Sequence, residues 1–121
     1  HLRDANIKNL KELGFPDADE DHVIMRTTVD TKEPRRQELL TKNHISLLFG
    51  DNLNDFSDIF EKKSPDVRNA LVDDASKLFG QRYIVLPNAM YGDWELALYG
   101  FDQKQSDSVK YSIRRQSLTA F

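Results

Sequence analysis

Apolar residues recur at helical spacing near the start of the chain, at Leu2, Ala5, Leu10 and Leu13. This spacing predicts a helix with one apolar face over residues 2–13. Gly14 supplies the end of this helix, and Pro16 prevents the helix from starting again.

A second helical pattern follows Ser64-Pro65-Asp66. Serine is a good helix cap, proline is tolerated at the first helical position, and an acidic residue is favoured near the positive end of the helix dipole. Apolar residues then continue at helical spacing at Val67, Ala70, Leu71, Ala75 and Leu78, up to Gly80. Further helices are predicted over Lys32–Lys42, over Trp94–Tyr99 and from Asp107 onward.

Three short segments have the composition of strands: His22–Thr27, Ile45–Phe49 and Tyr83–Pro87. Ile45–Phe49 is almost continuously apolar, which is typical of a strand buried on both faces of a parallel sheet. Because helices and strands alternate along the chain, we predict a single α/β unit with a parallel sheet flanked by helices.

The composition narrows the classes of function. The 121 residues are 39% hydrophobic and 31% charged, which suits a globular domain and is too apolar for a disordered chain. A net charge of -3 offers no basic surface for a nucleic acid polymer. The chain has no cysteine, which excludes thiolate metal sites and cysteine nucleophiles within it, and no apolar run of membrane-spanning length.

The stretch LLFGDNLNDF drives an apolar strand into an acidic loop. Ligands bind at the carboxyl ends of parallel strands, and Asp51 and Asp55 would lie there after the sharp turn that Gly50 permits. Their carboxylates are suitable ligands for Mg²⁺, which favours phosphate chemistry. The alternative is a polar turn in which Asn54 or Asp55 caps the next segment, and spacing alone favours that alternative because short acidic motifs often arise by chance.

A resemblance that extends beyond this loop favours the metal site over the polar turn. SLLFGDNLNDF resembles the fourth motif of the haloacid dehalogenase (HAD) superfamily, in the form found in bacterial class C acid phosphatases, which include lipoprotein-type 5′-nucleotidases. IKNLKELGFP, TKEPRRQEL and FGQRYIVLPNAMYGDWE also resemble this family, so that the similarity covers nearly the whole chain. The resemblance implies a Rossmann-like HAD fold and an acid phosphatase activity.

The resemblance assigns roles to individual residues. Asp51 matches the aspartate that ligates Mg²⁺, and Asp55 matches the second aspartate of the motif, which steadies the metal site. Lys32 matches the lysine that contacts the phosphate and the nucleophilic carboxylate; its alternative is a solvated residue at a helix start. Tyr91 is assigned to stacking on a nucleobase, and its alternative is a loop aromatic that covers the core. Trp94 is expected to anchor the core.

The family's nucleophile lies in a DxDxT-type motif, which we do not find in this chain. The segment Asp17–Asp21 imitates it, but no apolar strand leads into it and Asp21 replaces the threonine, so we interpret it as a solvated loop. A chain that begins at His1, within a predicted helix, is expected to be a fragment. Residues 1–121 are therefore expected to form the C-terminal portion of a single HAD-type phosphatase domain, whose sheet is incomplete without an upstream segment.

The resulting expectation is a Mg²⁺-dependent phosphomonoesterase, similar to the 5′-nucleotidases, that acts through an aspartyl-phosphate on an upstream aspartate. The chain alone is expected to be inactive. Two alternatives remain, a non-catalytic binding module and a receiver-like signalling domain. The family resemblance further implies an extracellular or cell-surface location in bacteria, with membrane attachment only through an upstream lipid anchor.

Overall fold

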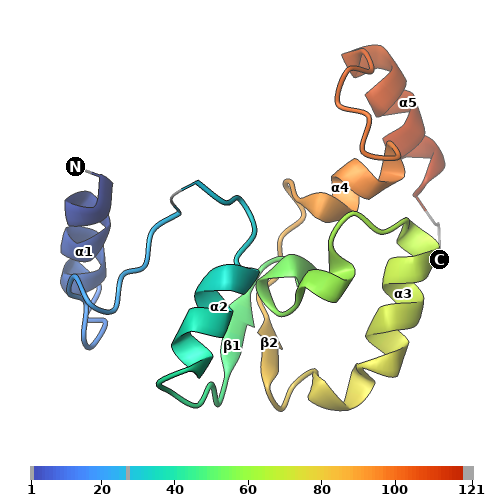
Figure 1. Cartoon of the computed structure of the whole chain (residues 1–121). Coiled ribbons are helices and arrows are strands. Elements are labelled where there is room, and N and C mark those ends of the chain that lie inside the picture. Colours follow the sequence, from blue (N-terminus) through green and yellow to red (C-terminus); the bar gives the residue numbers. More distant parts are fainter. Residues whose placement is uncertain (1, 27, 119–121) are drawn as a thin grey trace.

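The computed structural model describes residues 2–26 and 28–118. Its centre is a parallel sheet in which β1 (Leu48–Gly50) pairs with β2 (Tyr83–Val85), in the register Leu48 to Tyr83 and Gly50 to Val85 (Figure 1). The described part of the chain therefore confirms a parallel α/β arrangement. The remaining edge of β1 has no strand partner within the described residues.

Helices and 3₁₀ turns surround these two strands. The helices are α1 (Leu2–Glu12), α2 (Glu33–Leu40), α3 (Pro65–Asp74), α4 (Asp93–Leu98) and α5 (Asp107–Gln116). The 3₁₀ turns are η1 (Leu53–Asp55), η2 (Asp58–Phe60) and η3 (Ser76–Leu78). Figure 1 shows α1 standing apart from the sheet, while α5 lies beyond α4 at the opposite end.

The helix boundaries follow the local signals. α3 begins at Pro65 after an extended Ser64, whose side chain makes no capping hydrogen bond, and the chain turns at Gly80 with a φ of 77°. Gly14 also has a φ of 77°, a backbone conformation that glycine adopts without steric cost, and it follows α1 directly. The predicted helices are thus confirmed, although α3 ends at Asp74 and only the separate turn η3 extends the helical segment to Leu78.

The strand predicted at His22–Thr27 is wrong. Residues 22–26 have no regular secondary structure, and Thr27 lies outside the described residues. The Asp19 carboxylate accepts hydrogen bonds from the backbone N–H groups of Asp21 and His22, at 3.0 Å each. The start of this segment is therefore folded into a turn, and no neighbouring strand among the described residues offers it a ladder of hydrogen bonds.

The second predicted strand is shorter than expected and shifted along the chain. Regular pairing begins at Leu48 rather than at Ile45, and it includes Gly50. The prediction that this strand is buried on both faces is also wrong, because Leu47 is 50% exposed and Phe49 is 63% exposed. Alternate side chains of a strand point to opposite faces, and the described residues cover only the face of Leu48.

A small aromatic cluster lies directly after the acidic loop. Phe60 is fully buried and Phe56 is 3% exposed. The Phe56 ring stacks on Tyr83 of β2 with centroids 5.0 Å apart, and Phe79 meets both rings edge-on. This packing fixes the end of the loop that carries Asp55 against the sheet.

Among the helices that the structure describes, none is long and apolar enough to cross a membrane.

Candidate functional site

Asp51 is the first residue after β1, at the carboxyl end of the parallel sheet. The preceding Gly50 is buried, and its carbonyl accepts a hydrogen bond from Leu86 N at 2.8 Å. A Cβ atom at position 50 would lie 2.3 Å from the Cβ of Asp55. Only glycine therefore allows the strand to approach the loop closely enough to present Asp51 at this position.

Asp55 closes the acidic loop on itself. Its Oδ2 atom accepts the backbone N–H of Asp51 at 3.0 Å and that of Asn52 at 3.1 Å. Asn52 is the N-cap residue of η1, and Asp55 completes the capping box by accepting the Asn52 N–H. The next segment, η2, is capped by Ser57 and not by Asn54 or Asp55 as the turn interpretation expected. The loop is thus a capped turn, yet no hydrogen bond of that cap uses the Asp51 side chain, and a metal-binding role for Asp51 is compatible with it.

Lys32 lies next to the same carboxylate. It directly precedes α2, and its Nζ atom lies 2.5 Å from Asp55 Oδ1. The Asp55 side chain is only 10% exposed, whereas that of Lys32 is 57% exposed. Both Asp55 oxygens are therefore occupied, which suits a carboxylate that orders the loop and holds Lys32, while the lysine keeps an open side toward solvent.

Arg36 fastens α2 to the acidic loop. Its guanidinium is buried and donates to the backbone carbonyls of Asn54 at 3.2 Å and Asp55 at 2.8 Å. It also pairs with Glu33 one turn earlier, at 2.5 Å. Hydrogen bonds from Gln37 first, and then from Arg36, hold the pKa of Glu33 below its usual value. Through these bonds α2 holds Lys32 beside Asp55.

Arg68 of α3 forms hydrogen bonds to the acidic loop and to the turn that follows it. It is 3% exposed and donates to Phe60 O at 2.6 Å, Asn54 Oδ1 at 3.3 Å and Asn52 Oδ1 at 3.4 Å. Burial lowers the pKa of this guanidinium, and the nearby Asp93 opposes the change. An arginine stays protonated in a protein, so the group acts as a buried, fixed donor.

The loop between β2 and α4 brings Tyr91 to the same edge. Asn88 donates from Nδ2 to Asp51 Oδ2 at 3.0 Å, and its own Oδ1 accepts the backbone N–H of Tyr91 at 3.4 Å. The Tyr91 ring is 70% exposed, so it does not cover the core. The structure thus places all four predicted residues, Lys32, Asp51, Asp55 and Tyr91, around one end of the sheet.

The donor set is compatible with a hard cation. Asp51 presents an exposed carboxylate, and Mg²⁺ usually takes one or two carboxylates from a protein and completes its shell with water and phosphate. Within residues 2–26 and 28–118 no three acidic or histidine side chains converge as a complete metal site. The described residues therefore fit Mg²⁺ only as part of a ligand set, with Asp51 as the candidate ligand.

Residues of the acidic loop border hollows of the surface. One of about 310 Å³ is bordered by Asp51, Val85 and Trp94. Trp94 is partly buried there, with its indole N–H shielded from solvent and without a hydrogen-bond partner. Another, of about 490 Å³, is bordered by Asp30, Asn54 and Asp93.

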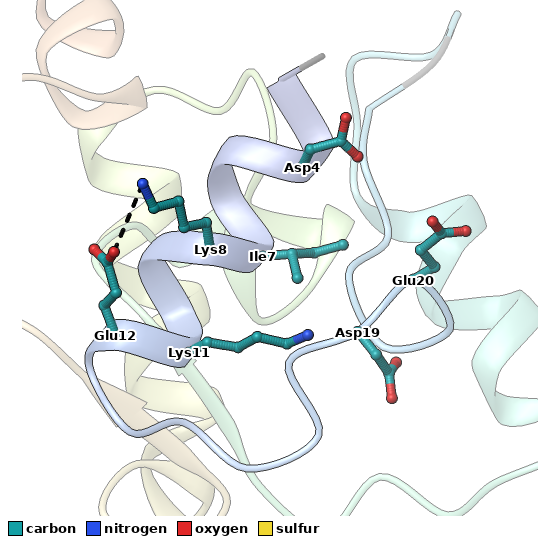
Figure 2. Close-up of a pocket in the computed structure, with 7 residues that line it drawn as sticks. All are labelled: Asp4, Ile7, Lys8, Lys11, Glu12, Asp19 and Glu20. Atoms are coloured by element: carbon teal, nitrogen blue, oxygen red, sulfur yellow. Dashed lines mark ion pairs between the residues drawn. The ribbon is translucent and has the colours of Figure 1, made fainter.

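A further pocket, of about 400 Å³, lies between α1 and the loop that follows it (Figure 2). Figure 2 shows Ile7 and Lys11 extending from α1 toward this loop, and Lys8 pairing with Glu12 along the helix. None of the four predicted site residues lines it. It is therefore separate from the candidate site.

Residues 1–94 match the family model for HAD superfamily subfamily IIIB, the acid phosphatases. The chain belongs to this family. It is also similar to the class C acid phosphatase of Bacillus anthracis, with 44% identity and a TM-score of 0.89 over 98% of this chain. The structure of that protein with tungstate bound gives 43% identity and a TM-score of 0.90.

The similarity covers 50% of the Bacillus chain in both structures, so this HAD chain spans about half the length of that relative. The predicted family and fold class are confirmed. The individual roles of Lys32, Asp51, Asp55 and Tyr91, and the placing of residues 1–121 as the C-terminal portion of the domain, stay predictions.

Sequence reasoning missed three residues of this HAD site: Arg36, Arg68 and Asn88. The helical pattern could have shown that Arg36 lies one turn after Lys32, but not that its guanidinium reaches the loop. No sequence signal relates Arg68 or Asn88 to their partners, because the contacts join segments far apart in the chain.

Proposed function

We propose that the intact protein that carries these residues is a Mg²⁺-dependent acid phosphatase acting on small phosphomonoesters, 5′-nucleotides among them. The observation that carries the proposal is the meeting of the exposed Asp51 with the Lys32–Asp55 pair at the carboxyl end of β1. Family membership supports this proposal, as does the class C acid phosphatase relative. Tungstate, bound to that relative, is a tetrahedral oxyanion with the shape of phosphate.

In the proposed reaction, a carboxylate from outside these residues attacks phosphorus and forms an aspartyl-phosphate. The bond from phosphorus to the ester oxygen breaks, and the leaving oxygen takes a proton from a second acidic residue of the same upstream segment. Water then hydrolyses the aspartyl-phosphate and releases inorganic phosphate. Bound Mg²⁺ would supply positive charge against the phosphoryl oxygens.

The residues of this chain prepare that step. Asp51 would hold the metal ion from its position after β1. Lys32 would place a second positive charge against the phosphoryl oxygens, where charge builds in the transition state. Asp55 keeps the ammonium of Lys32 in place, and both of its own oxygens are already engaged.

Phosphate release from a 5′-mononucleotide tests this function. We expect turnover with Mg²⁺, its loss in EDTA, its recovery on adding Mg²⁺ back, and competitive inhibition by tungstate. Asp51→Asn should lower kcat by about 100-fold or more, because the metal ion loses a charged ligand. Asp73→Asn, on the exposed surface of α3, is the matched control. Turnover that is insensitive to EDTA, or an Asp51→Asn enzyme with wild-type kinetics, would refute the assignment.

The nucleotide preference rests on Tyr91. An exposed aromatic ring can stack on any base, and each such contact contributes about 1–3 kcal/mol. Tyr91→Ala should therefore raise KM for a 5′-mononucleotide about tenfold and leave KM for glycerol phosphate unchanged. An equal change for both substrates would remove the stacking role.

A further inference from the structure

The side chain of Asn88 uses both ends of its amide at once. Its Nδ2 atom donates to Asp51 Oδ2 at 3.0 Å, while its Oδ1 atom accepts from Met90 N at 2.9 Å and Tyr91 N at 3.4 Å. One residue therefore contacts the candidate metal ligand and also shapes the backbone of the loop that carries the candidate base-binding ring.

The first of these bonds fixes the orientation of Asp51. This carboxylate is exposed, so packing alone does not select its rotamer. The hydrogen bond from Asn88 engages Oδ2 and so defines the direction in which Oδ1 points. Partners that orient a metal ligand in this way commonly contribute 10–100-fold to metal affinity or activity.

The second pair of bonds fixes the loop. An asparagine that accepts the N–H groups two and three residues later forms a local turn. The side chains of Met90 and Tyr91 are 83% and 70% exposed, so packing contributes little to their positions. The bonds to Asn88 thus connect the backbone of Met90 and Tyr91 to the residue that also contacts Asp51.

The far end of the loop is fixed independently of Asn88. Gly92 has a φ of 151°, and a Cβ atom there would lie 2.4 Å from Asn52 Nδ2. Next to it, Asn54 donates from its side chain to Asp93 Oδ2. Because the loop is attached to the acidic loop at this end too, loss of Asn88 should change the path of residues 88–91 without releasing α4.

We propose that Asn88 is a positioning residue that couples Asp51 to the Tyr91 loop, so that one amide sets both metal affinity and nucleotide affinity. This inference rests on the proposed function, because it takes Asp51 as a metal ligand and Tyr91 as the base-binding ring. In this role Asn88 acts through Asp51 and the Tyr91 loop, and not on the metal ion or the substrate directly.

Two substitutions separate the two ends of the amide. In Asn88→Ser the hydroxyl oxygen can still accept from the backbone two residues on, although more weakly, but the shorter side chain no longer reaches Asp51. In Asn88→Ala both contacts are lost. Neither substitution introduces a charge. Asn43→Ala is the control, since the exposed Asn43 side chain donates to Leu39 O, one turn earlier on α2.

The measurements are made on the intact protein. Titration calorimetry with Mg²⁺ alone should show about a tenfold loss of affinity in both Asn88 variants. At saturating Mg²⁺, KM for a 5′-mononucleotide should rise several-fold in Asn88→Ala and stay within about twofold of wild type in Asn88→Ser. KM for glycerol phosphate should stay near wild type in both variants, because this substrate has no base.

A Mg²⁺ affinity within twofold of wild type in both variants would overturn the proposal. So would equal KM changes in Asn88→Ser and Asn88→Ala, since the loop contact would then have no separate effect. If Asn88→Ala fails to fold, the Mg²⁺ affinity of Asn88→Ser alone decides the contact with Asp51. These outcomes differ from a failure of the proposed function itself, in which the wild-type protein would show no EDTA-sensitive turnover.

Discussion

Asp55 engages both of its carboxylate oxygens within the chain. One accepts from Lys32, and the other accepts the backbone N–H groups of Asp51 and Asn52. A carboxylate bound in this way has little capacity left for a metal ion, so the two aspartates of the loop have different tasks. Asp51 faces solvent, whereas Asp55 arranges the loop and the nearby lysine.

Lys32→Ala separates catalysis from stability. The lysine side chain is 57% exposed, and the mostly buried Asp55 keeps the backbone N–H groups of Asp51 and Asn52 as donors, so we expect the loss of the ion pair to lower the free energy of unfolding by about 1 kcal/mol. Removing a cation that stabilises the transition state should lower kcat by about 100-fold. We therefore expect a large fall in kcat with little change in the thermal midpoint. Lys8→Ala, which removes the exposed pair with Glu12, is the control. A lower midpoint with unchanged kcat would make Lys32 a structural residue.

At the residue scale, the sequence identified positions but not pairings. The family resemblance named Asp51, Asp55, Lys32 and Tyr91, and the structure places them together. The resemblance could not name Asn88, because the bond from Asn88 to Asp51 spans 37 residues and depends on two loops at the ends of neighbouring strands. Hydrogen-bond partners of that kind follow from tertiary packing and leave no local pattern.

At the scale of elements, one buried arginine joins α2 to the loop after β1. Arg36→Met should keep much of the volume of the side chain but leave the carbonyls of Asn54 and Asp55 without this donor, while Glu33 keeps its hydrogen bond from Gln37. We expect the free energy of unfolding to fall by about 2–4 kcal/mol. Chemical denaturation of the intact protein measures this, with the exposed Arg115→Met as control. A change below about 0.5 kcal/mol, as for an ordinary surface position, would contradict it.

The turn after α1 contains a pair that responds to pH. His22 Nδ1 lies 2.7 Å from Asp19 Oδ1, and this hydrogen bond raises the pKa of His22 above 6.5 and lowers the pKa of Asp19 below 3.8. Because the pKa of His22 is raised, its contribution to the free energy of unfolding is complete below pH 6.5. This contribution is lost as the pH rises through the pKa of His22 in the folded protein. The lowered pKa means that the aspartate contribution is present above pH 3.8 and is lost on acidification.

An NMR titration of the His22 ring checks this pair. Asp19→Asn should return the pKa of His22 toward its ordinary value of 6.5, because the main cause of the shift is removed. Asp17→Asn should change it less, since Asp17 acts only through its charge. An unchanged titration in Asp19→Asn would show that the hydrogen bond does not form in solution.

The strands were the least predictable elements. The residues of His22–Thr27 have strand-forming side chains, but a strand also needs a partner, and residues 22–26 have none among the described residues. The helices were predicted well because their signals are local, as in Ser64-Pro65 before α3 and Gly14 after α1. Helical hydrogen bonds join near neighbours, whereas strand hydrogen bonds join distant segments.

At the scale of the whole molecule, the described residues leave much apolar surface uncovered. Large hydrophobic side chains at least half exposed occur on α1, on α5, on both strands and in the loops: Leu2, Leu13, Phe15, Leu47, Phe49, Val85, Leu86, Met90, Tyr91, Tyr111 and Leu118. β1, which carries the exposed Phe49, also has one edge without a strand partner among the described residues. Surfaces and edges of this kind are normally covered in a stable domain.

We therefore expect the 121 residues produced alone to melt without a cooperative transition when followed by circular dichroism. Adding the proposed upstream half of the domain as a separate polypeptide should restore cooperativity, with the intact protein as the reference. A sharp transition at high temperature in the 121-residue chain alone would show that the exposed surface needs no cover.

The sequence by itself determined which segments are helical, the acidic loop that follows an apolar strand, and the family to which the chain belongs. These properties depend on side chains close together along the chain. Only the tertiary structure decided that Arg36 and Arg68 hold the loop, that Lys32 meets Asp55, and that Asn88 joins Asp51 to the Tyr91 loop. Those contacts depend on how the elements pack, because their partners are brought together only when β1, β2 and the helices around them assemble.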